Sequence, residues 1–580
     1  MSGSWRRLVF ANPDLAEGVV DHRAYALCVL ERLYLSLRRC DVYAAGGSRR
    51  WGDPRARLLD GNAWEQTRPQ VLTALRLTEP AETHLTDLAG RLDAAYTGLA
   101  ARLGPPDERG KDAAVRLEPG ADGRVRLHLA RLEALDEPPT LLALRELVAR
   151  MLPRVDLPEV LLEVDAWTGY LSEFSHVAEF GTRMQDLATS LAAVLVAEGC
   201  NLGLAPVVKP GHPALTRDRL SHVGQNYLRT DTLSAANARL IEAQAGIGVA
   251  QLWGGGLIAS VDGLRFVVPV RTLNAGPNPR YFGQERGVTY YNLTSDQFTG
   301  LGGIVVPGTL RDSLVLLSVL LEQETLLQPT EVMTDTGAYT DVMFGIFHLL
   351  GFQFSPRLAD IGGARFWCVD PNADYGALNG LARHRAKMPL VVQNWDDLLR
   401  LAGSLKLGLV QAGGLIRTLQ TNDRPTKLAR ALEEWGRVVK SLYLLSYIDD
   451  ESYRRRILVQ LNRGEGRHQL ARAVFHGKRG ELRQRYREGQ EDQLGALGLV
   501  VNVIVLWNTL YMDAALDQLR AEDYQVRDED VARLSPLGFE HINMLGRYAF
   551  TLPDAVARGE LRPLRNPASA GEEPDEPALT

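Results

Sequence analysis

The stretch "ASVDGLRFVVPV", from Ala259 to Val270, decides how the middle of the chain is interpreted. Apolar residues flank Asp262 on both sides, which is typical of a buried strand. Gly263 follows Asp262, and an Asp-Gly pair between two strand-like runs predicts a tight hairpin turn. Taken alone, the stretch favours a turn; the alternative is a carboxylate held at the end of a strand.

Short strand-like runs continue downstream of this stretch. They are "VTYYNLT", "GGIVVPGT", "TEVMTDTGAYTD" up to Thr334, "GFQFSPRL" and "RFWCVD". Two apolar helical runs, "RDSLVLLSVLLEQET" and "VMFGIFHLLG", lie between them. This alternation predicts a mixed α/β domain with a sheet of modest size. Asp335 ends a predicted strand. The ordinary structural alternative is that Asp335 caps the helix that follows.

The remainder of the 580 residues is mostly helical, so the predicted fold class is α+β and predominantly helical. We expect a helical scaffold domain at 1–103, a mostly helical domain at 104–245 and the mixed α/β domain at 246–370. A helical block at 371–460 should precede the last helices at 461–550. A C-terminal tail at 551–580 follows, and its composition predicts disorder from about residue 566.

Composition excludes several function classes. The net charge is −6, so any nucleic-acid surface must be a local patch. The four cysteines form no CxxC pair, which argues against a zinc site or a disulfide framework. The first residues lack a signal-peptide core, and the longest apolar stretch, 499–506, is too short to cross a bilayer. We therefore expect a cytoplasmic protein with no membrane partner.

Three carboxylates have settings that suit catalysis. Asp262 and Asp335 stand at predicted strand ends, and Glu465 lies in "LNRGEGRHQL" at a predicted helix start. Such a cluster would repel itself unless a cation lay among its members. Mg²⁺ prefers these oxygen ligands and leaves positions open for water and phosphate. Each carboxylate also has an ordinary structural explanation, and Glu491 in "GQEDQLGAL" is the rival for the third acid.

A basic run surrounds Glu465. Residues 453–487 contain 11 Lys or Arg against 2 acids, a local charge of +9. A solvated face and a groove that neutralises DNA phosphates explain this run equally well. In the second case we expect DNA contacts from Arg463, Arg467 and His468 in the run, and from Arg265 and Arg357 outside it.

Several long motifs appear in one order: "ASVDGLRF", "VMTDTGAYTDVMFGIFHLLGFQFSPRLADI", "LNRGEGRH", "GLVVNVIVLWNTLYMDAALDQL" and "LSPLGFEHINMLGRYAF". Together they resemble the catalytic half of the Tn3-family transposases, the cointegrate-forming class II family of bacterial transposons. The resemblance implies an RNase H-like DDE domain interrupted by a helical insertion before the last acid. It also implies that Asp262, Asp335 and Glu465 are the catalytic metal ligands.

This resemblance implies cleavage at transposon ends and transfer of the 3′-OH into target DNA during replicative transposition. The implied cofactor is two Mg²⁺ ions, for which Mn²⁺ can substitute, and the implied partners are transposon-end DNA, target DNA and a second copy of the chain. Localisation would be cytoplasmic, and nucleoid-associated when DNA is bound. Members of the family usually carry further N-terminal modules that bind the inverted repeats, and this chain lacks their pattern. Two rivals therefore remain: a truncated remnant that at most binds DNA or dimerises, and a structural or interaction protein.

Overall fold

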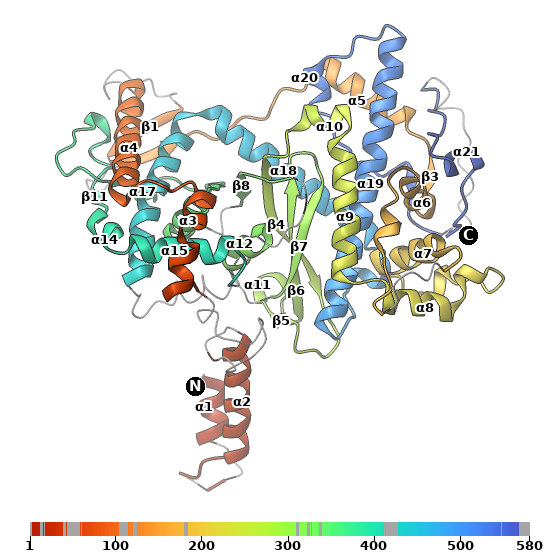
Figure 1. The fold of residues 1–580 in the computed structure, drawn as a ribbon, viewed down its shortest axis with the longest axis horizontal. Helices are drawn as coiled ribbons and strands as arrows, with labels where there is room; N and C mark the ends of the chain where they lie inside the picture. The colour runs from red at the N-terminus through yellow and green to blue at the C-terminus, as the bar shows by residue number, and fades with distance from the viewer. Residues whose placement is uncertain are drawn as a thin grey trace.

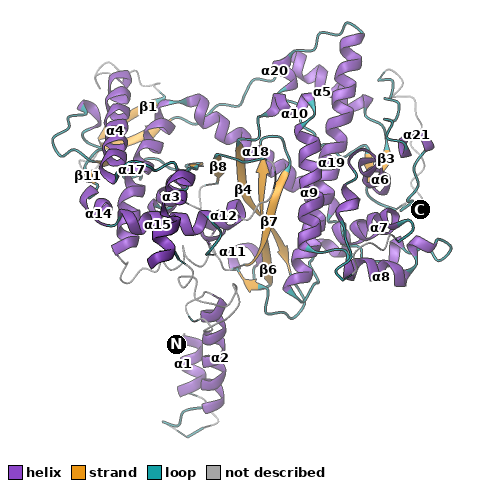
Figure 2. Ribbon diagram, in the orientation of Figure 1, coloured by secondary structure: helices purple, strands orange, loops and turns teal. Residues whose placement is uncertain are grey.

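A computed structural model of the chain places a six-stranded sheet between two helical lobes (Figure 1). Figure 2 shows that helices dominate both lobes and that the long strands are confined to the centre. The structure describes residues 3–11, 15, 16, 18–38, 42, 58, 59, 61–103, 114–119, 125–178, 184–308, 312–321, 325, 327–335, 339–410, 412, 427–546 and 548–567. Most of the tail expected to be disordered lies outside these residues.

The central sheet is antiparallel on one side and parallel on the other. Its order is β5-β6-β4-β8-β9, with β7 also paired to β6. The strands are β4 (Ile258–Val267), β5 (Gly276–Pro277), β6 (Arg286–Ser295), β7 (Gly300–Pro307), β8 (Glu331–Thr334) and β9 (Gln353–Pro356). β5, β6 and β7 join β4 through antiparallel pairing, whereas β8 and β9 run parallel to β4. The strand-like runs of the sequence thus form one sheet.

Strand β4 corrects the interpretation of the Asp-Gly pair. It continues without a break through Asp262 and Gly263 and pairs with β6 along its length from Ala259 to Val267. The hairpin prediction is wrong because Asp262 and Gly263 stay in the strand and pair with Asn292 and Tyr291 of β6. Gly263 is needed for a different reason: a Cβ there would lie 2.6 Å from the Thr289 Cγ2 atom on β6.

One lobe packs on the sheet face that carries Leu264 and Phe266. Its long helix α19 (Arg487–Ala521) is apolar and long enough to cross a membrane, but 83% of its most apolar window is buried inside the protein. α19 is therefore built as a core helix. Around it lie α5 (Pro139–Met151), α6 (Leu157–Thr168), α7 (Leu187–Gly199), α8 (Arg217–Asn226), α9 (Thr230–Ala245) and α10 (Gly248–Trp253).

The other lobe packs on the opposite sheet face, where Val261 lies. It combines α12 (Asp312–Leu321), α13 (Asp341–Leu349), α14 (Met388–Gln393), α15 (Trp395–Lys406) and α17 (Lys427–Asp449) with the early helices α3 (Gly61–Leu75) and α4 (Ala81–Leu103). Tyr96 of α4 stacks on Tyr375 with ring centroids 4.3 Å apart, and Trp64 Nε1 donates to Asp396 Oδ2 at 2.7 Å. Segments 61–103 and 367–449 therefore share one core.

The remaining elements lie at the periphery. They are the hairpin of α1 (Gly3–Phe10) and α2 (His22–Arg38), which projects below the body in Figure 1, the pairs β1 (Val115–Pro119) with β2 (Val125–Leu129), β3 (Val155–Asp156) with β12 (Ile542–Asn543) and β10 (Trp367–Cys368) with β11 (His384–Arg385), and the short helices α11 (Pro279–Phe282), α20 (Asp528–Val531) and α21 (Asp554–Ala557).

Helix α18 (Glu451–Val474) joins the two lobes and crosses the sheet. The expected domain boundaries at 103 and 245 coincide with the ends of α4 and α9, whereas the boundary at 460 falls inside α18. The division of the chain into domains stays a prediction.

Candidate active site

Two aspartates stand at neighbouring positions of parallel strands. The last paired residues of β4 and β8 are Val261 and Thr334, and the next residues are Asp262 and Asp335. Residues at the same level of neighbouring parallel strands point to the same face, and such strands lie roughly 4.8 Å apart. Asp335 is exposed and Asp262 is half-buried. Asp335 therefore follows β8 at the level at which Asp262 stands on β4, although it is not among the side chains that cluster with Asp262.

Helix α18 brings a third carboxylate onto the same face. The side chain of Asp450 caps this helix by accepting from Tyr453 N at 3.1 Å, so Glu465 lies well inside the helix and not at its start. The expectation of a helix start is wrong because the glycines beside Glu465 do not break the helix. A Cβ at Gly464 would lie 3.3 Å from Ser260 Oγ, so glycine lets α18 lie close against β4.

The contact between α18 and β4 is polar and buried. Gln460 Nε2 donates to Ser260 Oγ at 3.2 Å and to Thr294 O at 3.0 Å. Glu465 and His468 lie five and eight residues further along α18, and residues three apart on a helix share a face. These bonds fix the register of the helix against the strand and so fix where Glu465 and His468 meet the sheet.

Asp262, Glu465 and His468 form a cluster that suits a cation. One ligand atom from each lies within 4.8 Å of the others. His468 Nδ1 is 3.4 Å from Asp262 Oδ2, and the His468 side chain is buried. No other group of three His, Cys, Asp or Glu side chains among the described residues meets the same criterion. Two oxygen donors and one imidazole are a ligand set that divalent metals accept.

The surroundings keep Asp262 charged. Burial alone would raise the pKa of Asp262, but the hydrogen bond and the charge of His468 outweigh it. The Gly263 amide, which donates to Asp262 Oδ1 at 2.7 Å, adds to the effect, and so does Arg265. The pKa of Asp262 therefore lies below its ordinary value, and the carboxylate is ready to bind a cation.

Two of the arginines predicted to contact DNA are turned into the protein. Arg467 is 4% exposed and donates to Phe298 O at 3.2 Å and Gly498 O at 3.3 Å. Burial lowers the pKa of Arg467 to about 10. Arg463 donates to Asp296 O at 2.7 Å and Trp253 O at 3.1 Å. In this geometry both guanidinium groups tie α18 to the loops around it, and Arg467 does not reach the surface.

The other predicted DNA contacts lie differently. Arg357 is exposed and directly follows β9. Its backbone N donates to the carbonyl oxygen of Thr334, the last residue of β8, so Arg357 lies next to the strand end that Asp335 follows. Side chains of a strand alternate between its two faces, so Arg265 lies on the face opposite Asp262. Its guanidinium lies 3.7 Å from the centroid of the Tyr281 ring. His468 contacts Asp262 and is 3% exposed. Arg357 is thus the predicted cation nearest to the strand ends with an exposed side chain.

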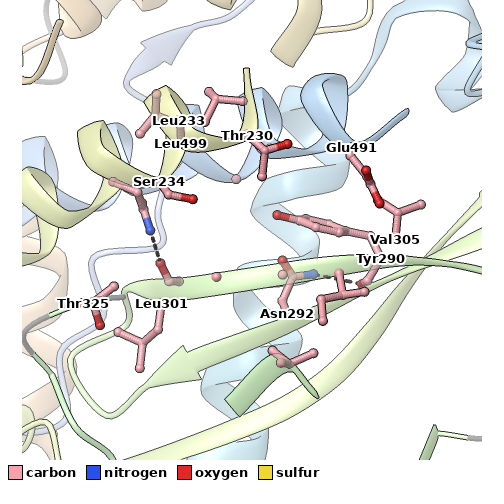
Figure 3. Close-up of a pocket in the computed structure, with 18 of the residues that line it drawn as sticks. Thr230, Leu233, Ser234, Tyr290, Asn292, Leu301, Val305, Thr325, Glu491 and Leu499 are labelled. Carbon is pink, nitrogen blue, oxygen red and sulfur yellow. Dashed lines mark hydrogen bonds between the residues drawn. The ribbon is translucent and has the colours of Figure 1, made fainter. Parts of the chain in front are cut away.

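Sequence reasoning missed Asn292. It pairs directly with Asp262 across β4 and β6, so both side chains share a face. Asn292 also lines a pocket of about 270 Å³ between the sheet and helices α9 and α19, where Figure 3 shows it beside Tyr290. No local motif marks Asn292; only the strand pairing, which the sequence does not specify, brings it next to the acids.

Glu491, the rival for the third acid, lies elsewhere on the same pocket. Figure 3 shows its carboxylate above Val305 and Tyr290, and Arg487 Nε donates to Glu491 Oε1 at 2.5 Å. Glu491 is absent from the cluster that holds Asp262 and Glu465. An ion pair within the first turns of α19 is the role that this geometry gives to Glu491.

Comparison with known proteins adds independent findings. The Tn3 transposase DDE domain family matches residues 159–548, a range that includes all three acids. The chain is 54% identical over 97% of its length to a transposase for transposon gamma-delta from Escherichia coli (strain K12), and 52% identical over 98% of its length to a transposase for transposon Tn4556 from Streptomyces fradiae. A transposase for transposon Tn1546 from Enterococcus faecium is 33% identical over 97% of the chain. The chain spans 55%, 62% and 55% of the length of these three relatives.

Proposed function

This chain belongs to the Tn3 transposase DDE family, and on that basis we propose that it cuts DNA strands at transposon ends and joins the resulting 3′-OH groups to target DNA in replicative transposition. The single observation that carries the proposal is the cluster of Asp262, Glu465 and His468, with Asp335 at the neighbouring strand position. Both reactions exchange one phosphodiester bond for another, so one site serves both.

Divalent metal binding fits the residues that are present. Asp262, Asp335 and Glu465 would supply carboxylate oxygens, and we propose two Mg²⁺ ions, with Mn²⁺ as a substitute that tolerates the nearby imidazole of His468. Bound divalent ions would activate the attacking hydroxyl and offset the charge on the leaving oxygen.

The protein's own residues prepare this chemistry in three ways. The low pKa keeps Asp262 in the anionic form that a cation needs. The buried His468 orients the Asp262 carboxylate through its Nδ1 atom, 3.4 Å away. Arg357, exposed beside the strand ends, offers a guanidinium to a DNA phosphate. In cleavage, a water oxygen bonds to phosphorus and the 3′ oxygen leaves. In strand transfer, that 3′-OH bonds to a target phosphorus and displaces the 3′ oxygen of the target strand.

We also propose that residues 246–370 and 461–550 form one RNase H-like domain, interrupted by the helical block at 371–460. The sheet supports this assignment, because three antiparallel strands are followed by two strands parallel to β4. The proposed partners are transposon-end DNA and target DNA, bound by two copies of the chain. The proposed location is the cytoplasm, at the nucleoid when DNA is bound.

Cleavage of labelled transposon-end DNA, intact or pre-nicked, tests the proposal. Asp262→Asn, Asp335→Asn and Glu465→Gln should each abolish Mg²⁺-dependent cleavage, because each removes the charge that holds the cation and keeps the side-chain size. Glu491→Gln, four residues into α19, is the matched control and should still cut. Circular dichroism should show all four variants folded. Cleavage retained by the Asp335→Asn or Glu465→Gln protein would count decisively against the assigned site.

A further inference from the structure

The basic turn, residues 477–487, joins α18 to α19 and carries an aromatic side chain that the acid cluster does not use. Tyr486 is 76% exposed, the largest exposure among the large hydrophobic side chains described as exposed. It lies between Arg485 and Arg487 in the sequence "RQRYR". An exposed ring next to cations in the sequence is available to stack on a base of a nucleic acid.

The backbone of the basic turn is held in a disfavoured shape. Lys478 and Arg479 have φ of 48° and 60°, a left-handed conformation that residues other than glycine rarely adopt. Asn201, which is fully buried, holds the turn by donating from Nδ2 to Gly477 O and to Glu481 O, both at 2.8 Å. The turn is therefore fixed in place by the buried interior beneath it.

A second anchor connects the basic turn to the catalytic strand. The amide of the buried Leu482 donates to Val267 O at 2.9 Å, at the end of β4. Val267 lies five residues beyond Asp262 on that strand, a separation of about 17 Å at the usual rise of a strand. A DNA segment of a few nucleotides spans this length and can reach both places.

The charges of the basic turn are only partly neutralised. Glu481 pairs with Arg483 at 2.9 Å, and Glu491 pairs with Arg487 at 2.5 Å. Within the part of the chain that the structure describes, no carboxylate forms an ion pair with Arg479 or Arg485. Both side chains are exposed. Two exposed guanidinium groups and an exposed ring on one turn are the kinds of group with which proteins bind single-stranded nucleic acid.

We propose that the basic turn binds an unpaired stretch of the DNA substrate a few nucleotides from the cleaved bond, with Tyr486 stacked on a base and Arg479 and Arg485 on phosphates. This inference rests on the proposed function only in taking DNA as the substrate. The fixed backbone of the turn presents the ring and the two cations together, so binding costs little ordering of the chain.

Metal-free binding assays test the inference separately from catalysis. Fluorescence polarisation in EDTA would follow a short single-stranded oligonucleotide and the same sequence as a duplex. Tyr486→Ala should weaken single-strand binding about tenfold and leave the salt dependence unchanged, because a stacked ring carries no charge. Tyr486→Phe should bind as the unmodified chain does. Arg485→Ala and Arg479→Ala should each reduce the slope of log K against log salt by about 0.7.

Tyr524→Ala is the matched control, since Tyr524 is an exposed tyrosine just beyond the other end of α19, and it should leave binding unchanged. A 2-aminopurine probe should be quenched by the unmodified chain and not by Tyr486→Ala. Equal binding by Tyr486→Ala and the unmodified chain would overturn the inference, and so would a Tyr486→Ala effect on self-association alone. Cleavage lost in Asp262→Asn while Tyr486→Ala binds normally would leave the proposed function standing and remove only this inference.

Discussion

Replacing His468 with alanine should make metal binding more sensitive to acid. His468 Nδ1 lies 3.4 Å from Asp262 Oδ2 and holds the pKa of Asp262 below its ordinary value against the effect of burial. A hydrogen bond to a charged group contributes about 1.5–3 kcal/mol. The long distance and the 40% exposure of the Asp262 side chain place this one at the lower end of that range, about 1.5 kcal/mol.

The sign of the change follows from the direction of the shift. A carboxyl whose pKa is depressed stays ionised as the pH falls, and metal binding needs the ionised form. Without His468 the pKa of Asp262 rises, so the pH at which Mn²⁺ affinity is half lost should move up. Affinity well above that pH should change less.

Calorimetric titration of Mn²⁺ over a pH series measures this midpoint. His468→Asn is the informative companion, because its amide nitrogen can take the place of Nδ1 and should restore part of the shift. Circular dichroism would establish that both variants are folded. An unchanged midpoint in a folded His468→Ala protein would refute the claim that His468 sets the ionisation of Asp262.

Three further changes have definite expected results. Gly464→Val should reduce Mg²⁺-dependent cleavage at least tenfold while leaving DNA binding intact, because the added side chain pushes α18 away from Ser260; full activity would show that the close approach is unimportant. Glu163→Ala should cost about 3 kcal/mol in urea unfolding, since Glu163 is fully buried and its Oε2 accepts from Arg562 Nε at 3.0 Å; a loss below about 1 kcal/mol would contradict this. Burial, followed by smaller effects of nearby groups, raises the pKa of Asp492 to about 6, so ionised Asp492 lowers stability as the pH rises through 6. Asp492→Asn should therefore raise the melting temperature at pH 8 and much less at pH 4, and an equal gain at both would show another cause.

The sequence predicted the site best where local pattern and tertiary structure agree. Asp335 follows a short run whose pattern predicts a buried strand, and β8 ends at Thr334 as expected. Asp262 was harder, because the Asp-Gly pair favours a turn locally, and only pairing with β6 and β8 keeps β4 extended. A tertiary contact overrode a local preference.

Glycines and arginines near Glu465 are further cases in which tertiary contacts, which the local sequence does not specify, decide the structure. Glu465 was predicted at a helix start, but α18 continues through it, and Gly464 serves the contact with Ser260, which lies about two hundred residues earlier in the chain. A solvated face and a DNA-facing groove explained the basic run equally well, yet Arg467 donates to backbone carbonyl groups while Arg485 faces water. Charge counted along the sequence does not reveal which cations have protein partners.

The core shared by segments 61–103 and 367–449 has a consequence during synthesis. Trp64 and its partner Asp396 are 332 residues apart, so a ribosome adding 5–20 residues per second needs roughly 20 to 70 seconds to supply the second after the first. Throughout that interval the apolar face of α4, with Leu88, Leu92 and Tyr96, has no finished surface to bury it. The early helices of the nascent chain therefore need protection, for example by a chaperone, until α17, which ends at Asp449, has emerged.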